Sequence, residues 1–260
     1  MSPSSVSRIA RLSDGARPFW VFLDDDGRVR PASGDPCTRL DPVGPPRTTD
    51  GLTWLPPCIP TKIVGVGRNY RAHAAELGNE VPAEPLLFFK PPSALIAHDA
   101  AIVLPAASAR VDHEGEIGVV IGRRLKDAGE AEALAGVLGY TCVNDVTARD
   151  LQKKDVQFTR AKGFDTFCPV GPCVALGLAP ADLTVETWVN GARRQSAPAS
   201  GMIFGIATLL SYISRVMTLE PGDLIATGTP EGVAPLRPGD QVTVVVAGVG
   251  RLVNRVVAAP

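Results

Sequence analysis

Three carboxylates at the ends of apolar runs form the first group of residues with a chemistry of their own. Glu114 and Glu116 stand two positions apart at the start of an apolar run, so in a strand their side chains point to the same face. Asp145 directly follows a second apolar run, 140–144. A solvated strand edge would explain the first pair alone. Three carboxylates at strand ends instead predict a hard, oxygen-rich site that needs a counterion.

The ion that suits such a site is Mg²⁺ or Mn²⁺, or Ca²⁺, rather than zinc. None of the five cysteines forms a C-x-x-C pair, and the three histidines are scattered along the chain. Carboxylate ligands alone would leave coordination positions open for the paired oxygens of a substrate, such as the carboxylate and keto oxygens of a 2-oxo acid. The site therefore predicts Lewis-acid chemistry on a small-molecule 2-oxo acid.

A second group of residues could move protons. His73 and Glu76 have helical i, i+3 spacing, and a carboxylate that orients an imidazole makes it a better general base. An ordinary surface pair is the alternative. Lys162 is a lone cation in an apolar and aromatic segment, where it either stabilises an enolate or oxyanion beside the metal or simply pairs with an acid.

Other kinds of site lack their motifs. Gly65 and Gly67 begin like a dinucleotide-binding loop, but Tyr70 stands where the third glycine belongs and no repeated βαβ pattern follows. The chain has no P-loop and no G-x-S-x-G nucleophile elbow. Its 26 basic and 27 acidic side chains nearly cancel, so no global field attracts phosphate backbones. We expect neither nucleotide nor nucleic-acid binding.

The elements that position these side chains are mainly strands, and we expect a mainly β fold with some helix. Apolar strands are predicted over residues 62–66, 115–122 and 140–144. Helices are predicted over residues 69–78, 128–138 and 204–217. Asn69 is the expected N-cap of the first helix, and Asn190-Gly191 is the signature of a β-hairpin.

The chain divides near residues 55–60. Residues 1–58 alternate short apolar runs with turn clusters, which is typical of a small strand-rich N-terminal domain, and residues 59–260 form the larger catalytic domain. An odd number of cysteines indicates reduced thiols and a cytoplasmic protein. No signal-peptide-like stretch is visible, and the most apolar run, Val242–Gly250, is too short to span a membrane.

Six motifs stand in order along the chain from about Lys62 to the C-terminus. They are GVGRNYRAHAAE (65–76), FFKP (88–91), HEGE (113–116), NDVTARDLQ (144–152), KGFDTFCP (162–169) and TGTPEGV (227–233). Together they resemble the fumarylacetoacetate hydrolase family. The resemblance implies a mixed β-roll catalytic domain, a small variable N-terminal domain and a homodimer.

The resemblance also implies roles for the two groups described above. Glu114, Glu116 and Asp145 would be the ligands of Mg²⁺ or Mn²⁺. His73 and Glu76 would be a water-activating dyad on a short lid helix that closes over bound substrate.

Further residues match positions of the family around the substrate. Lys162 and Gln152 would be polar groups near the reacting carbonyl. Thr229, with the backbone of Gly228, matches the loop that holds the carboxylate of the 2-oxo acid. Lys90 and Arg149 match family positions that are tied to no single role.

Three functions compete. The first is a divalent-metal-dependent acylpyruvate hydrolase of the fumarylpyruvate type in aromatic compound catabolism, in which His73 and Glu76 activate water for C–C cleavage and a pyruvate enolate leaves on the metal. Arg68 or Arg71, beside His73, could hold a second substrate carboxylate. The alternative is an isomerase or decarboxylase of 2-hydroxyhepta-2,4-dienedioate-like or oxaloacetate-like acids, with His73 moving protons only. A non-catalytic, metal-dependent dicarboxylate-binding protein is the third, but a binder has no need of the dyad and the lysine.

Overall fold

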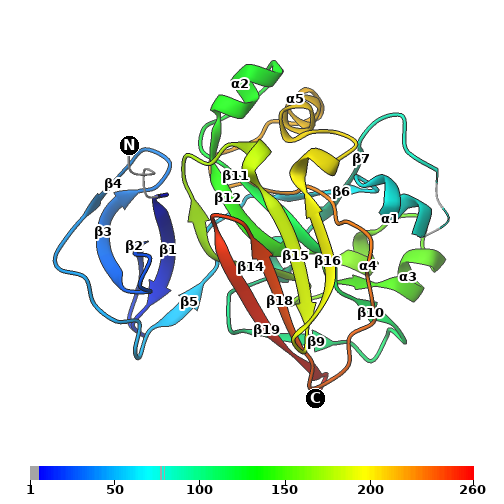
Figure 1. The fold of residues 1–260 in the computed structure, drawn as a ribbon, viewed down its shortest axis with the longest axis horizontal. Helices are drawn as coiled ribbons and strands as arrows, with labels where there is room; N and C mark the ends of the chain where they lie inside the picture. Colours follow the sequence, from blue (N-terminus) through cyan, green and yellow to red (C-terminus); the bar gives the residue numbers. More distant parts are fainter. Residues whose placement is uncertain (1–5, 77, 79) are drawn as a thin grey trace.

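Strands are the commonest secondary structure in the computed structural model, which describes residues 6–76, 78 and 80–260 (Figure 1). Within these residues a twelve-stranded sheet has the order β4 (Arg39–Pro42), β3 (Val29–Asp35), β2 (Pro18–Leu23), β1 (Arg8–Ser13), β14 (Cys168–Ala175), β12 (Val137–Asn144), β11 (Gly115–Ile121), β17 (Leu224–Ala226), β6 (Ile63–Gly67) and β7 (Leu86–Lys90). Beside this path, β5 (Thr53–Leu55) pairs with β1, and β8 (Leu95–Ile96) pairs with β14. Residues 1–5 of the predicted N-terminal domain and Leu77 of the predicted helix 69–78 lie outside the described residues.

A second sheet packs against the first. Its order is β16 (Ala192–Pro198), β15 (Thr184–Val189), β18 (Gln241–Val246), β19 (Gly250–Ala258) and β9 (Ala101–Leu104). A short pair of strands consists of β10 (Val111–Asp112) and β13 (Thr147–Ala148). The α-helices are α1 (Arg71–Glu76), α2 (Glu130–Ala135), α3 (Arg149–Lys154), α4 (Thr159–Lys162) and α5 (Ile206–Val216). Single turns of 3₁₀ helix are η1 (Pro92–Ala94), η2 (Pro180–Asp182) and η3 (Ala199–Gly201).

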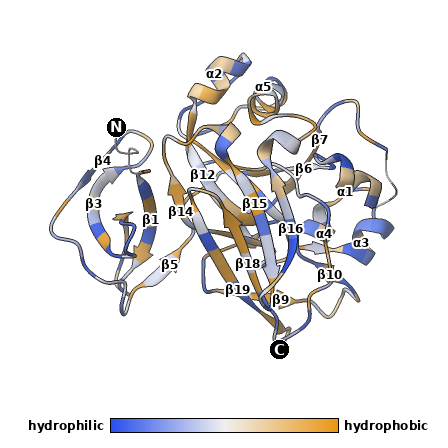
Figure 2. Ribbon diagram, viewed as in Figure 1, coloured by the Kyte–Doolittle hydropathy of each residue, from blue (hydrophilic) through white to orange (hydrophobic). Residues whose placement is uncertain are grey.

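The core lies between the two sheets, where β12 and β14 face β18 and β19. Strand β11 is buried on both faces: Ile117 and Val119 join the same apolar cluster as Val244 of β18, whereas Val120 joins a second cluster. Strands buried on both faces read as continuous apolar runs, which explains the sequence of β11. Figure 2 shows the hydrophobic colour along β14 and β18 and the hydrophilic colour on α3.

The predicted mainly β architecture is confirmed. Strands β6, β11 and β12 match the three apolar runs, and α5 matches the helix predicted over 204–217. Asn190 and Gly191 turn the β15–β16 hairpin with φ values of 51° and 78°. The helix predicted over 128–138 is shorter than expected, because Val137 already pairs with Ile121 in the large sheet.

Asn69 does not cap the helix that follows it, and this prediction was wrong. Its amide nitrogen donates to the carbonyl oxygens of Phe204 and Thr227 at 3.1 and 2.8 Å, and its amide oxygen accepts from the N–H of Phe204 at 2.9 Å. The fully buried side chain therefore joins the segment just before α1 to the segment just before α5 and to the loop after β17. Gly228 in that loop has a φ of 100°, and a Cβ atom there would lie 2.6 Å from the Cβ of Asn69.

The N-terminal strands are hydrogen-bonded into the large sheet, since β1 pairs with β14 through Arg8↔Ala175 and Ile9↔Val174 (Figure 1). All five cysteines are free thiols, as expected. Within the described part of the chain, no helix is both long and apolar enough to cross a membrane.

Candidate active site

The pairing of β11 with β12 brings the predicted metal ligands together. Gly115 is the partner of Asn144, so Glu114, just before β11, lies next to Asp145, just after β12. The N–H of Asp145 donates to the carbonyl oxygen of Glu114 at 2.8 Å, which closes this end of the ladder. Glu116 lies two residues further along the same face of β11.

Gly115 must be a glycine for this arrangement. A Cβ atom there would lie 1.9 Å from Oγ1 of Thr187, on strand β15 of the second sheet. The E-G-E spacing therefore lets the second sheet pack directly against the strand that carries two acidic side chains.

The three carboxylates fit a divalent cation. One oxygen from each of Glu114, Glu116 and Asp145 lies within 4.8 Å of the others, and all three side chains are buried. Burial and the neighbouring carboxylates of Asp145 and Glu114 raise the pKa of Glu116 well above its ordinary value. An all-oxygen donor set with uncompensated negative charge is the chemistry that hard cations such as Mg²⁺ and Mn²⁺ prefer.

Basic side chains neutralise the other two acids. Nζ of Lys162 donates to Glu114 at 2.6 Å and to Asp145 at 2.5 Å, and Nζ of Lys90 donates to Asp145 at 2.7 Å. Arg149 donates to the second oxygen of Glu114. Burial alone would raise the pKa of Glu114, but the charges of Lys162 and Arg149 outweigh it and lower that pKa. Burial likewise opposes the charged form of Lys162, but Asp145 and Glu114 raise its pKa.

The two members of the predicted dyad are in contact. Nδ1 of His73 lies 3.2 Å from Oε2 of Glu76, so the neutral imidazole that donates from Nδ1 keeps Nε2 as a base. The His73 side chain is buried, and the Glu76 side chain is partly exposed. This is the arrangement of a general base with an orienting carboxylate.

The loop after β17 holds the carboxylate site from one side. The N–H of Gly228 donates to Glu116 at 2.8 Å, and the hydroxyl of Thr229 donates to the carbonyl oxygen of Gly115 at 2.9 Å. Nε2 of Gln195 donates to the Thr229 hydroxyl at 2.7 Å. In this structure the N–H of Gly228 and the hydroxyl of Thr229 thus both donate to oxygen atoms of the protein itself.

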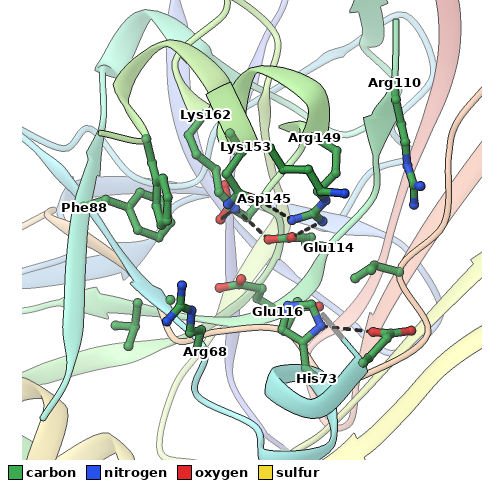
Figure 3. Close-up of a pocket in the computed structure, with 17 residues that line it drawn as sticks. Arg68, His73, Phe88, Arg110, Glu114, Glu116, Asp145, Arg149, Lys153 and Lys162 are labelled. Atoms are coloured by element: carbon green, nitrogen blue, oxygen red, sulfur yellow. Dashed lines mark hydrogen bonds and ion pairs between the residues drawn. The ribbon is translucent and has the colours of Figure 1, made fainter. Parts of the chain in front are cut away.

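A cavity of about 470 Å³ collects most of the predicted residues (Figure 3). Its lining includes the predicted residues Arg68, His73, Glu76, Glu114, Glu116, Asp145, Arg149, Gln152, Lys162 and Thr229. Lys90 and Gly228 contact the site from behind without lining the cavity. Arg71 is exposed and lies outside the lining, so of the two arginines suggested for a second carboxylate only Arg68 faces the cavity.

Several residues of the site were not predicted from the sequence. Buried Asp112 accepts from Nε of Arg149 and Nε of Arg110, both at 2.9 Å. Lys153 lines the cavity one residue after Gln152, and its i, i+4 spacing from Arg149 on α3 is the one pattern that could have indicated it.

The sequence matches two family models, which together cover most of the chain. Residues 62–257 match the family model described as Fumarylacetoacetate (FAA) hydrolase C-terminal, and residues 7–57 match one described as Rv2993c-like, N-terminal. The chain belongs to the fumarylacetoacetate hydrolase family, which confirms the resemblance inferred from the six motifs.

Similar proteins are named as an isomerase, a tautomerase and a decarboxylase. A solved structure from Mycobacterium marinum, described as 2-hydroxyhepta-2,4-diene-1,7-dioate isomerase, has a TM-score of 0.89 and 41% identity, and the match covers 97% of this chain and 98% of that one. Oxaloacetate tautomerase YisK of Bacillus subtilis is 43% identical over 207 residues, 75% of this chain and 69% of the relative. The mitochondrial oxaloacetate decarboxylase of Dictyostelium discoideum is 44% identical over 199 residues, 72% of this chain and 89% of the relative.

Proposed function

We propose that the protein is a divalent-metal-dependent isomerase or tautomerase of 2-oxo dicarboxylic acids of the oxaloacetate or 2-hydroxyhepta-2,4-dienedioate type. The observation that carries this proposal is the His73–Glu76 pair in one cavity with the three carboxylates and Lys162. The names of the relatives favour this alternative over the acylpyruvate hydrolase. Mg²⁺ or Mn²⁺ is the proposed ion because both take oxygen ligands.

The chain supplies a base, an orienting acid and a cation for this reaction. A cation bound by the carboxylates would polarise the 2-oxo group of the substrate. Nε2 of His73 moves a proton between the carbon next to that group and, in a tautomerisation, the enol oxygen or, in an isomerisation, another carbon of the conjugated system, while Glu76 fixes the tautomer of the imidazole. The ammonium of Lys162 stabilises the negative charge that develops on the keto oxygen.

Hydrolysis of an acylpyruvate is the second candidate. The same dyad can activate water that enters the cavity that His73 and Glu76 line. Loss of CO₂ from oxaloacetate needs only the polarised 2-oxo acid and no added water, so decarboxylation is a variant of the first proposal.

Product analysis separates these reactions. Purified protein with Mg²⁺ is incubated with enol oxaloacetate, a 2-hydroxydienedioate, fumarylpyruvate and acetylpyruvate, with EDTA and protein-free samples as controls. We expect an EDTA-sensitive change of the ultraviolet spectrum with conserved mass on one of the first two compounds. Pyruvate and a second acid from an acylpyruvate, with no change in the first two, would instead establish the hydrolase.

Variants of α1 test the role of the dyad in the same assay. His73→Gln should lower kcat by at least about 100-fold, since a positioned general base contributes about 10²- to 10⁴-fold. Arg71→Gln is the matched control, because Arg71 lies on the same helix outside the cavity lining. Equal activity of both variants would overturn the proposal that His73 moves the proton.

We also propose that the protein is cytoplasmic, because its five cysteines are free thiols. We propose further that it forms a homodimer. Leu86 and Phe89 of β7, the edge strand of the large sheet, are exposed, and an apolar strand edge favours a protein partner. Light scattering after gel filtration tests this proposal, and a monomer at micromolar concentration would contradict it.

A further inference from the structure

One side of the cavity carries more positive charge than its acidic partners balance. Arg110, Arg149 and Lys153 all line this side, and the N–H of Arg149 donates to the carbonyl oxygen of Arg110 at 2.7 Å, so their backbones are adjacent. The two arginines share Asp112, and Arg149 also donates to Glu114. Lys153 is exposed on α3 at the edge of the cavity lining, and it has no hydrogen-bond or ion-pair partner among the described residues.

The charge of Lys153 is therefore free for a ligand. The metal-binding carboxylates already engage Lys162, Lys90 and Arg149, and a bound cation would add further positive charge. A substrate with a single carboxylate, placed at the cation, leaves Lys153 without a counter-charge. A substrate with two carboxylates places one negative charge at the cation and the other at Lys153.

We infer that Lys153, beside Arg110, binds the second carboxylate of the substrate and selects 2-oxo dicarboxylic acids over 2-oxo monocarboxylic acids. This inference rests on the proposed function, and it names the residue that recognises the second carboxylate, away from the reacting carbonyl. Arg149, held by Asp112 and Glu114, separates this subsite from the carboxylate cluster.

Arg68 is the rival for this role. It also lines the cavity, but Figure 3 shows it on the opposite side of the carboxylates from Arg110, near Phe88. The cation near Phe88 besides Arg68 is Lys162, which is already paired with Glu114 and Asp145, whereas Lys153 belongs to a group of three cations. Two or more cations around one carboxylate give the stronger and more selective site.

The test compares two substrates that differ in one charge. Oxaloacetate and its C4 methyl ester share their carbon skeleton and 2-oxo acid group, but the ester lacks the second negative charge. Ketonisation of both enols is followed by ultraviolet absorbance with Mg²⁺. Calorimetric binding of oxalate with Mg²⁺ reports the metal end alone.

Lys153→Gln should lower kcat/KM for oxaloacetate about 5- to 10-fold, mainly through KM, because water screens a charged hydrogen bond made by an exposed side chain. The same variant should leave the methyl ester and the oxalate Kd within about twofold, and Lys153→Arg should retain the preference for oxaloacetate. Lys154→Gln is the matched control, since Lys153 and Lys154 are both exposed on α3 but Lys154 lies outside the cavity lining.

Two results would overturn the inference alone. In the first, the wild type converts oxaloacetate but Lys153→Gln loses no more activity than Lys154→Gln. In the second, Arg68→Gln, rather than Lys153→Gln, removes the preference for the dicarboxylate. Binding of oxalate without conversion of oxaloacetate, its methyl ester or a 2-hydroxydienedioate would instead defeat the proposed function, and the inference with it.

Discussion

Oε1 of Glu76 accepts a hydrogen bond from the backbone N–H of Gly232 at 3.0 Å, which ties helix α1 to the loop that follows β17. Its other carboxylate oxygen, Oε2, lies 3.2 Å from Nδ1 of His73. One side chain thus orients the imidazole and holds the helix over the cavity that both residues line.

Glu76→Gln should separate these two tasks. The glutamine oxygen can still accept from Gly232, but its amide nitrogen would donate to Nδ1 of His73 and move the imidazole proton to Nε2. His73 would then present the wrong tautomer, so we expect kcat to fall by about 10²- to 10⁴-fold with a small change in KM. Steady-state kinetics measure both constants.

The control for this change is Glu80→Gln, which alters an exposed acid close to the same helix. Wild-type kcat in Glu76→Gln would show that the tautomer of His73 does not matter for the reaction.

Glu116→Gln should stabilise the metal-free protein. Among the described residues, the hydrogen-bond partner of the Glu116 carboxylate is the N–H of Gly228, and a glutamine oxygen can keep that bond. Removing one of three clustered negative charges should therefore raise the free energy of unfolding in EDTA by about 1 kcal/mol. Thermal unfolding in EDTA measures this gain.

The same variant should lose the stabilisation that Mg²⁺ gives the wild type, because a ligand that binds only the native state stabilises it by mass action. Glu132→Gln, on the exposed surface of α2, should keep the effect of Mg²⁺. A lower midpoint of Glu116→Gln in EDTA would mean that Glu116 supports the fold as well as the site.

The parts of the site that depend on local spacing could be predicted from the sequence. Glu114 and Glu116 share a face because strands alternate, and His73 meets Glu76 because helices repeat every three to four residues. Asp145 could be added to the predicted metal ligands because it ends a second apolar run, and that run, β12, does pair with β11.

The parts that depend on distant contacts could not be predicted. Asn69 looks like an N-cap locally, but its partners Phe204 and Thr227 lie 135 and 158 positions away. Gln195, 82 positions from His113, supports the Thr229 loop without any motif of its own. Such residues become visible only when the fold brings their partners together.

Gly115→Ala should destabilise the protein through the contact between the two sheets. The added Cβ would lie 1.9 Å from Oγ1 and 3.2 Å from Cβ of Thr187, so strands β11 and β15 must move apart. Overpacking of this kind costs about 1–3 kcal/mol. Chemical denaturation of Gly115→Ala, Thr187→Ala and the double variant measures the coupling.

The double variant should recover most of the lost stability, because Thr187→Ala removes the closest atom. Oγ1 of Thr187 is itself buried without a hydrogen-bond partner in the described structure, so its removal alone should cost little. If the stability losses of the two single variants simply add in the double variant, the contact between residue 115 and Thr187 is not the source of the strain.

The stability of the protein should fall above about pH 9 because buried thiols resist ionisation in the native state. Burial, slightly offset by the charge of Arg8, raises the pKa of Cys173 from 9.0 to about 12. Between these values the unfolded chain loses the thiol proton and the native chain keeps it, so unfolding releases a proton and becomes more favourable as pH rises. The expected slope for this thiol is about −1.4 kcal/mol per pH unit. Urea unfolding from pH 8.5 to 10.5 measures it, and Cys173→Ala should have a shallower slope than the wild type by that amount; parallel slopes would mean that the native thiol ionises as readily as the unfolded one.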